Sequence, residues 1–255
     1  MEINDDHLAN IKRKLEQSIK VNGIAILPPM DVLESTELLR LIGQRTTVSM
    51  IDPWYNKGTG GVRSDYVEFV TGILSKVSNL SEHIYLWGFP EIAAQFVSRI
   101  PDQFSLTAWL TWYYKNNPSV IRGWRSSQQT CLHLSTDKAK LYPEHFLNDS
   151  QKIKLAAGKL RYIPGPTSVI ESALNIGFIR KKEQTGHPAQ KPENVYEKLL
   201  LMTMLKDQYV FDPMAGSGTT GAVAQKHDFK AILADENDDY ISLMEKRLNT
   251  KRLDI

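Results

Sequence analysis

The feature that most constrains the fold is a glycine-rich turn near the C-terminus, between a short apolar run and an amphipathic run. The apolar run is Val210–Asp212, and the chain continues with Pro-Met-Ala-Gly-Ser-Gly-Thr-Thr. The pattern that follows predicts a helix over Thr219–His227 and a second strand over Lys230–Asp235. A strand, a glycine turn, a helix and a strand in this order are typical of a parallel α/β sheet.

The glycine turn has the composition of a cofactor-binding loop. Gly216 and Gly218 allow positive φ angles and a close approach of a ligand to the main chain. The helix start after them offers free N–H groups and a positive dipole end. Asp235 stands 19 residues after Gly216 (235 − 216 = 19), where a carboxylate accepts hydrogen bonds from both ribose hydroxyls. We therefore expect a nucleoside-type cofactor, rather than a tight turn without a ligand.

A nicotinamide dinucleotide is an alternative ligand for this turn. Gly216, Gly218 and Gly221 have the spacing of the dinucleotide-binding fingerprint. However, Asp212 places a carboxylate before the loop, where it repels a pyrophosphate but attracts a cationic sulfonium that carries an amino-acid tail. The charge pattern therefore favours a sulfonium cofactor.

A second turn, Asp52-Pro53-Trp54-Tyr55, follows a β-type run over Thr47–Ile51. The Asp52 carboxylate and the Pro53 carbonyl can accept both N–H groups of an exocyclic amine, which aims the nitrogen lone pair at an electrophile. Tyr55 offers a flat face for an extruded base, and such stacking contributes ~1–3 kcal/mol per base. Taken alone, this tetrapeptide is more typical of an ordinary turn with Trp and Tyr in the core.

Further periodic segments surround these two turns. Apolar residues at helical spacing predict a helix from Tyr66 to Val77, and the clean alternation of Phe104–Tyr114 predicts a strand. The other predicted elements are strands over His83–Trp87 and Thr130–Leu134, and helices over Glu91–Ile100, Pro192–Lys206 and Asp238–Asn249.

Positive charge is concentrated in the middle of the chain. From Tyr113 to Gly186 there are 12 Lys or Arg against 5 Asp or Glu, a local net charge of +7, whereas the whole chain carries +2. Within one domain spanning residues 1–255, we interpret Ser135–Gly186 as an irregular, basic inserted lobe that recognises a nucleic-acid target. The candidate DNA-binding residues are Arg122, Arg125, Arg180, Lys181 and Lys182.

The N-terminal segment has no apolar signal core, and no apolar run approaches the length of a membrane span. The single cysteine, Cys131, cannot form an intrachain disulfide, which fits a reducing compartment. These features predict a soluble cytoplasmic protein.

Three segments together resemble DNA amino-methyltransferases. Asp52–Tyr55 resembles their DPPY motif, Asp212–Thr220 their FxGxG-type cofactor loop, and His187–Pro192 (HPAQKP) the HPTQKP segment before that loop. The order of the segments is that of the β class. The resemblance implies an α/β, Rossmann-like methyltransferase fold, with a mostly parallel seven-stranded sheet and helices on both faces. It also implies S-adenosyl-L-methionine as cofactor and no metal.

The resemblance assigns roles to matching positions. Gln190 and Lys191 would meet the methionine carboxylate of the cofactor, and Asp235 its ribose. The catalytic turn would comprise Asp52, Pro53, Trp54 and Tyr55. The loop around the methionine part would comprise Asp212, Pro213, Ala215, Gly216, Ser217, Gly218, Thr219 and Thr220. Trp54 departs from the family, because it replaces the second proline of the motif and removes the stiffness that proline gives to a turn.

The expected function is methylation of N6 of adenine, on a base flipped out of double-stranded DNA. The nearest alternative is cytosine N4, and the resemblance favours adenine because cytosine enzymes of this class more often have serine at the position of Asp52. A catalytically silent DNA-binding subunit and an RNA or protein-amide methyltransferase are further alternatives. The sequence leaves open whether the protein forms a homodimer and whether a cognate restriction enzyme accompanies it.

Overall fold

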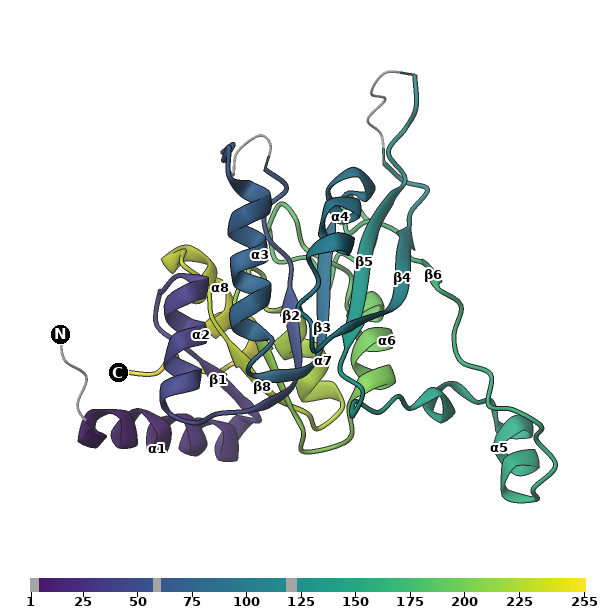
Figure 1. The fold of residues 1–255 in the computed structure, drawn as a ribbon, viewed down its shortest axis with the longest axis horizontal. Coiled ribbons are helices and arrows are strands. Elements are labelled where there is room, and N and C mark those ends of the chain that lie inside the picture. The colour runs from purple at the N-terminus through teal and green to yellow at the C-terminus, as the bar shows by residue number, and fades with distance from the viewer. Residues whose placement is uncertain (1–4, 57–60, 118–122) are drawn as a thin grey trace.

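A single mixed sheet forms the centre of the computed structural model, which describes residues 5–56, 61–117 and 123–255. Among these residues the sheet has eight strands in the order β1-β8-β7-β2-β3-β5-β4-β6 (Figure 1). The strands are β1 (Ile24–Ile26), β2 (Thr46–Ile51), β3 (Ser81–Gly88), β4 (Ser105–Tyr113), β5 (Gln128–Ser135), β6 (Val169–Glu171), β7 (Tyr209–Asp212) and β8 (Lys230–Leu233). Only the pairings of β5 with β3 and with β4 are antiparallel, so the predicted mostly parallel sheet is confirmed.

Helices cover both faces of the sheet. They are α1 (Asp5–Asn22), α2 (Val32–Leu41), α3 (Tyr66–Val77), α4 (Pro90–Phe96), α5 (Asp149–Ala156), α6 (Glu193–Thr203), α7 (Thr219–Lys226) and α8 (Asp238–Leu248). Short 3₁₀ helices occur at Val97–Arg99 and Pro143–Phe146. No helix within the described ranges is long and apolar enough to cross a membrane.

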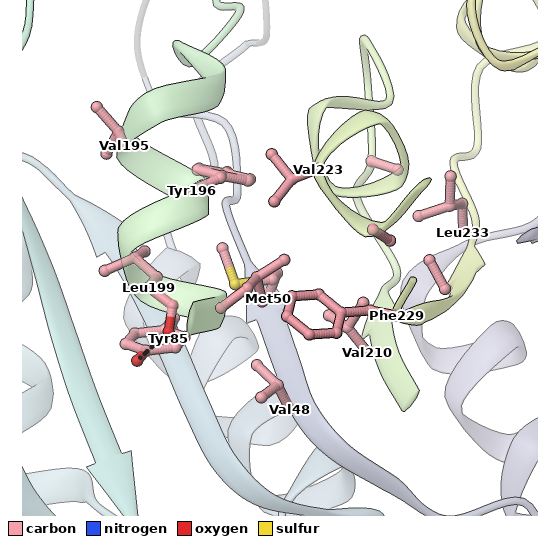
Figure 2. Packing of buried hydrophobic residues seen from close by; sticks show 14 of the residues in the cluster. Val48, Met50, Tyr85, Val195, Tyr196, Leu199, Val210, Val223, Phe229 and Leu233 are labelled. Atoms are coloured by element: carbon pink, nitrogen blue, oxygen red, sulfur yellow. Dashed lines mark hydrogen bonds between the residues drawn. The ribbon is translucent and has the colours of Figure 1, made fainter. Parts of the chain in front are cut away.

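Alternate residues of the central strands pack into hydrophobic clusters on the two faces of the sheet. Val48 and Met50 of β2 pack with Val210 of β7 against α6, α7 and α8, as Figure 2 shows. Ile51 points to the other face, where it packs against α3 and α4, and Phe211 joins the core beneath α1 and α2. Because side chains alternate across a strand, these short apolar runs bury both faces, as parallel sheets do.

The central pair of strands forms a topological switch point. β2 and β7 run parallel, with Val48 opposite Val210 and Ser49 opposite Phe211. From β2 the chain passes through α3 to β3 on one side, whereas from β7 it passes through α7 to β8 on the other. Ligands of open α/β sheets bind beyond the carboxyl ends of strands at such a point. Asp52 and the glycine loop, which follow these two strands, therefore lie at the same edge.

The sheet has one strand more than the seven implied by the resemblance. β6 pairs in parallel with β4, with Thr111 opposite Val169, and it lies inside the segment we expected to be an irregular lobe. Its three residues cover part of the backbone of β4, which would otherwise be the exposed edge of the sheet. Upstream, α1, β1 and α2 are elements that the sequence patterns did not reveal.

The alternation predicted for Phe104–Tyr114 is not maintained in the structure. A bulge shifts the register of β4 against β5 between Leu106 and Ala108. One extra residue changes the face of the side chains after it, so Leu106, opposite Leu134, shares a face with Trp109, opposite Leu132; the two are 37% and 39% exposed.

The predicted lobe, residues 135–186, divides between two edges of the sheet. β5 is antiparallel to β3, so its last residue, Ser135, lies opposite His83 at the start of β3, far from the edge that carries Asp52. The segment that contains α5 extends from that remote edge (Figure 1). It is attached there to the end of α6, because the Tyr142 amide donates to the Met202 carbonyl. After β6 the chain returns to the carboxyl edge.

Candidate active site

A buried lysine connects the two catalytic-turn residues that the sequence singled out. The Nζ atom of Lys191 lies 2.6 Å and 2.8 Å from the two carboxylate oxygens of Asp52, and it donates to the Tyr55 hydroxyl at 2.6 Å. The side chains of Lys191 and Asp52 are 2% and 16% exposed. We call this group the Asp52–Lys191–Tyr55 cluster. Burial alone would lower the pKa of Lys191, but the charge of Asp52 and the hydrogen bonds from the lysine raise it above its ordinary value.

Two further side chains extend the cluster. The Tyr196 hydroxyl of α6 donates to Oδ2 of Asp52 at 3.2 Å, and the Tyr55 hydroxyl donates to Oε1 of Gln129 on β5 at 2.9 Å. Burial, with the nearby charge of Asp52, raises the pKa of Tyr55 to about 12, so its hydroxyl stays protonated. The cluster therefore ties the catalytic turn to α6 and to the β4–β5 hairpin.

Trp54 packs inward, away from the cluster. Its ring contacts Tyr66 edge-on, with 5.3 Å between centroids, and lies 5.8 Å from the ring of Phe69. Its carbonyl accepts a hydrogen bond from the Tyr66 hydroxyl at 2.6 Å. The aromatic anchor on α3 therefore holds the turn in shape where the family has a proline, while the buried Pro53 keeps its place between Asp52 and Trp54.

The glycine loop folds back onto the end of β8. Gly216 and Gly218 have φ angles of +48° and +74°, which only glycine adopts without strain. The Gly216 amide donates to Oδ2 of Asp235 at 2.9 Å, and Oδ1 of Asp235 accepts from the Asn237 amide at 3.0 Å. A Cβ atom on Gly218 would lie 2.9 Å from Cγ of Met244. The loop is therefore both conformationally and sterically restricted to glycine.

Asp212 holds both ends of the glycine loop through hydrogen bonds to its carboxylate oxygens. It accepts a short hydrogen bond from the Thr220 hydroxyl at Oδ2 and one from the Met214 amide at Oδ1, 3.2 Å away. Burial raises the pKa of Asp212 to about 7, more than these hydrogen bonds lower it. The rest of the loop is also tied down: the Ala215 amide donates to the Ala234 carbonyl at 2.9 Å, and the Ser217 hydroxyl pairs with Thr219 at 3.1 Å.

The shifted carboxyl group gives a pH prediction. Because the pKa of Asp212 is higher in the folded than in the unfolded chain, the folded state binds more protons between about pH 4 and pH 7. The contribution of Asp212 to wild-type stability therefore falls as pH rises through this window. Asp212→Asn removes this titration, so the free energy of unfolding of the variant should rise relative to wild type across the window. Urea unfolding at several pH values measures this difference, and a pH-independent difference would contradict the prediction.

Gln190 and Lys191, which we expected to contact the cofactor, form hydrogen bonds within the protein. The Gln190 amide oxygen accepts from the Thr185 amide and hydroxyl, each at 2.9 Å, and its nitrogen donates to the Glu183 carbonyl at 2.7 Å. The Lys191 carbonyl accepts from the Thr219 hydroxyl at 3.1 Å. Lys191 thus lies between the catalytic turn and the cofactor loop, and its predicted contact with a methionine carboxylate stays a prediction.

The sequence matches the family model N6_N4_Mtase, described as DNA methylase, over residues 47–246. This match spans 200 of 255 residues (246 − 47 + 1 = 200). The chain belongs to the N6/N4 DNA methylase family.

Alignments of this chain with individual curated relatives are shorter than the match to the family model. The type II methyltransferase M.HpaI of Haemophilus parainfluenzae is 27% identical over 149 residues, which cover 56% of this chain and 45% of that protein. The DNA adenine methyltransferase YhdJ of Escherichia coli (strain K12) is 40% identical over 67 residues, 26% of this chain and 23% of that protein. The chain thus spans less than half the length of these curated relatives.

Solved structures show the same fold. The complex of M1.HpyAVI with SAM superposes with a TM-score of 0.68 at 19% identity, over 89% of this chain and 99% of that one. The cytosine-N4-specific PvuII DNA methyltransferase gives a TM-score of 0.58 at 17% identity, over 91% and 97%. The Rossmann-like methyltransferase fold predicted from the sequence is confirmed.

Several side chains of this candidate site gave no clear signal in the sequence. Tyr196 and Gln129 complete the cluster, and Arg247 of α8 donates to the Ser217 carbonyl at 2.8 Å and to Glu193 at 2.7 Å. The ring of His187 lies against Gly216. The position of Tyr196 on the apolar face of the predicted Pro192–Lys206 helix could have indicated its role, because a buried tyrosine hydroxyl needs a hydrogen-bond partner.

The predicted DNA-binding residues have different surroundings. Arg125 is exposed and lines a cavity of about 180 Å³ with Lys115 at the β4–β5 hairpin. Lys181 and Lys182 are exposed, whereas Arg180 donates to the Ser172 hydroxyl at 2.8 Å and supports its own loop. Arg122 lies outside the described residues.

Proposed function

We propose that this protein transfers a methyl group from S-adenosyl-L-methionine to N6 of adenine in double-stranded DNA. The observation that carries the proposal is the meeting of the catalytic turn and the glycine loop at the β2–β7 switch point, in a chain of the N6/N4 DNA methylase family. The names of the curated relatives support a restriction–modification setting.

The loop residues fit a sulfonium nucleoside. When bound, S-adenosyl-L-methionine supplies an electrophilic methyl group. Gly216 and Gly218 give the loop the left-handed turn that presents the start of α7 at the end of β7, and we expect Asp235, which follows β8, to accept from ribose hydroxyls. The carboxyl group of Asp212 lies under the loop, where its ionised form favours a cation over a pyrophosphate.

The catalytic turn positions the acceptor amine. The Asp52 carboxylate and the Pro53 carbonyl accept the two N–H groups, and the ring of Tyr55, held by the ring of Phe89 at 4.7 Å, supports the base. The bound cofactor would supply its methyl group to the nitrogen lone pair held in this way, with the C–S electron pair remaining on a neutral thioether. The nitrogen then releases one proton to water. This chemistry consists mainly of positioning.

Adenine is the proposed target because residue 52 is an aspartate rather than a serine. The relatives include both kinds of enzyme, since YhdJ is named an adenine methyltransferase and PvuII a cytosine-N4 enzyme. DNA treated with the protein and tritiated cofactor, then digested and analysed by mass spectrometry, should contain N6-methyladenine. Detection of N4-methylcytosine instead would overturn the choice of base, and absence of both would overturn the proposed activity.

DNA is expected to contact the carboxyl edge, where Lys181 and Lys182 are exposed. Neutralising both to alanine should weaken binding and reduce the slope of log K against log salt by about 1.8, since each phosphate contact contributes ~0.9. The matched control neutralises Lys154 and Lys159 near α5, at the remote edge of the sheet. Fluorescence anisotropy at several salt concentrations measures both slopes. Equal slopes for the two variants would rule out this placement of the DNA.

A further inference from the structure

The Asp52–Lys191–Tyr55 cluster contains a charge that the proposed reaction does not obviously need. Lys191 is almost fully buried, and Asp52 is its ion-pair partner among the described residues. Its ammonium also lies 5.1 Å from the ring centre of Trp87 and 5.2 Å from that of Tyr55. Burying a lysine costs free energy unless its partners compensate. We therefore ask what the ion pair between Lys191 and Asp52 contributes to the reaction.

We infer that Lys191 is a positioning residue for methyl transfer, which fixes Asp52 and Tyr55 relative to each other and directs the target amine to Oδ1 of Asp52. This inference rests on the proposed function, because it concerns the amine acceptor of that reaction.

The distribution of donors around Asp52 singles out one oxygen. A carboxylate has about four acceptor sites, two on each oxygen. Lys191 occupies one site on each oxygen, and Tyr196 occupies a second on Oδ2. Among the contacts of the described residues, the remaining site lies on Oδ1. An incoming N–H group therefore meets an acceptor at a single, defined place.

The ammonium also sets the chemical character of Asp52. An ammonium can only donate hydrogen bonds, so both oxygens of Asp52 act as acceptors toward Lys191. The same ammonium holds the Tyr55 hydroxyl, whose second hydrogen bond goes to Gln129. The amine acceptor and the stacking ring are thus fixed by one atom, in a network anchored on β5 and α6.

The kinetic test uses Lys191→Met, which keeps an unbranched side chain only one atom shorter but removes the charge, and Lys191→Arg, which keeps the charge. In single-turnover methyl transfer at saturating cofactor and DNA, the methionine variant should react ~100-fold more slowly, the loss typical of a misplaced reacting group. Its dissociation constants for cofactor and DNA should change less than about 3-fold, because a residue that only positions Asp52 and Tyr55 contacts neither ligand. The arginine variant should recover to within about 10-fold of wild type.

Lys206→Met is the matched control, because Lys206 forms an ion pair with Asp228 in which both side chains are 68% exposed. It should leave every constant unchanged. A Lys191→Met rate within about 3-fold of wild type overturns the inference. So does a deficit that excess cofactor restores, since that result would make Lys191 a contact of the cofactor itself.

A second measurement tests the cluster without activity. Thermal unfolding of Asp52→Asn, Lys191→Met and the double variant forms a double-mutant cycle. Each single variant should lower Tm by roughly 5–15 °C, because it leaves a buried group without its partner. The double variant should lose much less than the sum. Additive losses overturn the cluster even if the wild type methylates DNA, and an inactive wild type overturns the proposed function while this cycle still decides the inference.

Discussion

Asp52→Asn is expected to reduce methyl transfer by about 10³-fold, the effect of removing one well-placed electrostatic contact to the reacting group. Asparagine is neutral and replaces one of the two oxygens that accept from the Lys191 ammonium by an NH₂ group, so it removes the negative charge next to the target amine and weakens the hold of Lys191 on position 52. Cofactor affinity should change less than about 3-fold, because Asp52 follows β2 and contacts no residue of the glycine loop in the described contacts. Single-turnover kinetics and calorimetric titration with the cofactor measure the two quantities separately.

Asparagine is a better replacement than alanine at this position. Both replacements remove the carboxylate, but asparagine keeps one acceptor oxygen for the Lys191 ammonium, whereas Asp52→Ala would leave that buried ammonium with no acceptor at position 52 and so cause the larger loss of stability. The loss of activity would then be mixed with partial unfolding. Asp228→Asn serves as control, since Asp228 forms an exposed surface pair and asparagine tolerates its positive φ angle of 57°. If Asp52→Asn methylates DNA as fast as this control, the proposed mechanism fails.

Gly218→Ala should destabilise the fold and weaken cofactor binding together. A left-handed conformation costs a residue with a Cβ atom about 1–2 kcal/mol. The new Cβ would also lie 2.9 Å from Cγ of Met244, and overpacking of this kind adds about 1–3 kcal/mol. The expected loss is therefore roughly 2–5 kcal/mol in the free energy of unfolding, with a distorted loop at the start of α7.

Gly43→Ala separates the two contributions. Gly43 has a similar φ angle of +68°, but a Cβ atom there would meet nothing within 4 Å. It should lose only the conformational part, about 1–2 kcal/mol, with unchanged affinity for the cofactor. Chemical unfolding and calorimetric titration with the cofactor compare the two variants. Equal losses of stability and equal affinities would show that the contact with Met244 is irrelevant to the loop.

Local patterns predicted most of the elements but failed where pairing intervened. The alternation of Phe104–Tyr114 correctly indicated β4, yet the bulge between Leu106 and Ala108 changed which side chains are buried. Similarly, the basic composition of residues 135–186 gave no sign that β6 would join the sheet. Both features depend on the partner strand, which lies far away in the sequence.

The same limit applies to Lys191. The motif around it suggested a contact with the cofactor, whereas the structure places its ammonium on a carboxylate 139 positions earlier in the chain. Spacing along a chain defines which residues share a turn or a helix face. It carries no information about which of two neighbouring ligands a long, flexible side chain reaches.

The sequence by itself determined the strand–turn–helix units, the requirement for glycine at 216 and 218, and the chemical types at the two turns, because these depend on φ angles and on side-chain periodicity within a few residues. Only the tertiary structure decided that β2 and β7 are neighbours, that Trp54 packs against α3, and that the basic segment divides between two edges. Strand order and edge location result from burying both faces of one sheet at once, which is a property of the whole core.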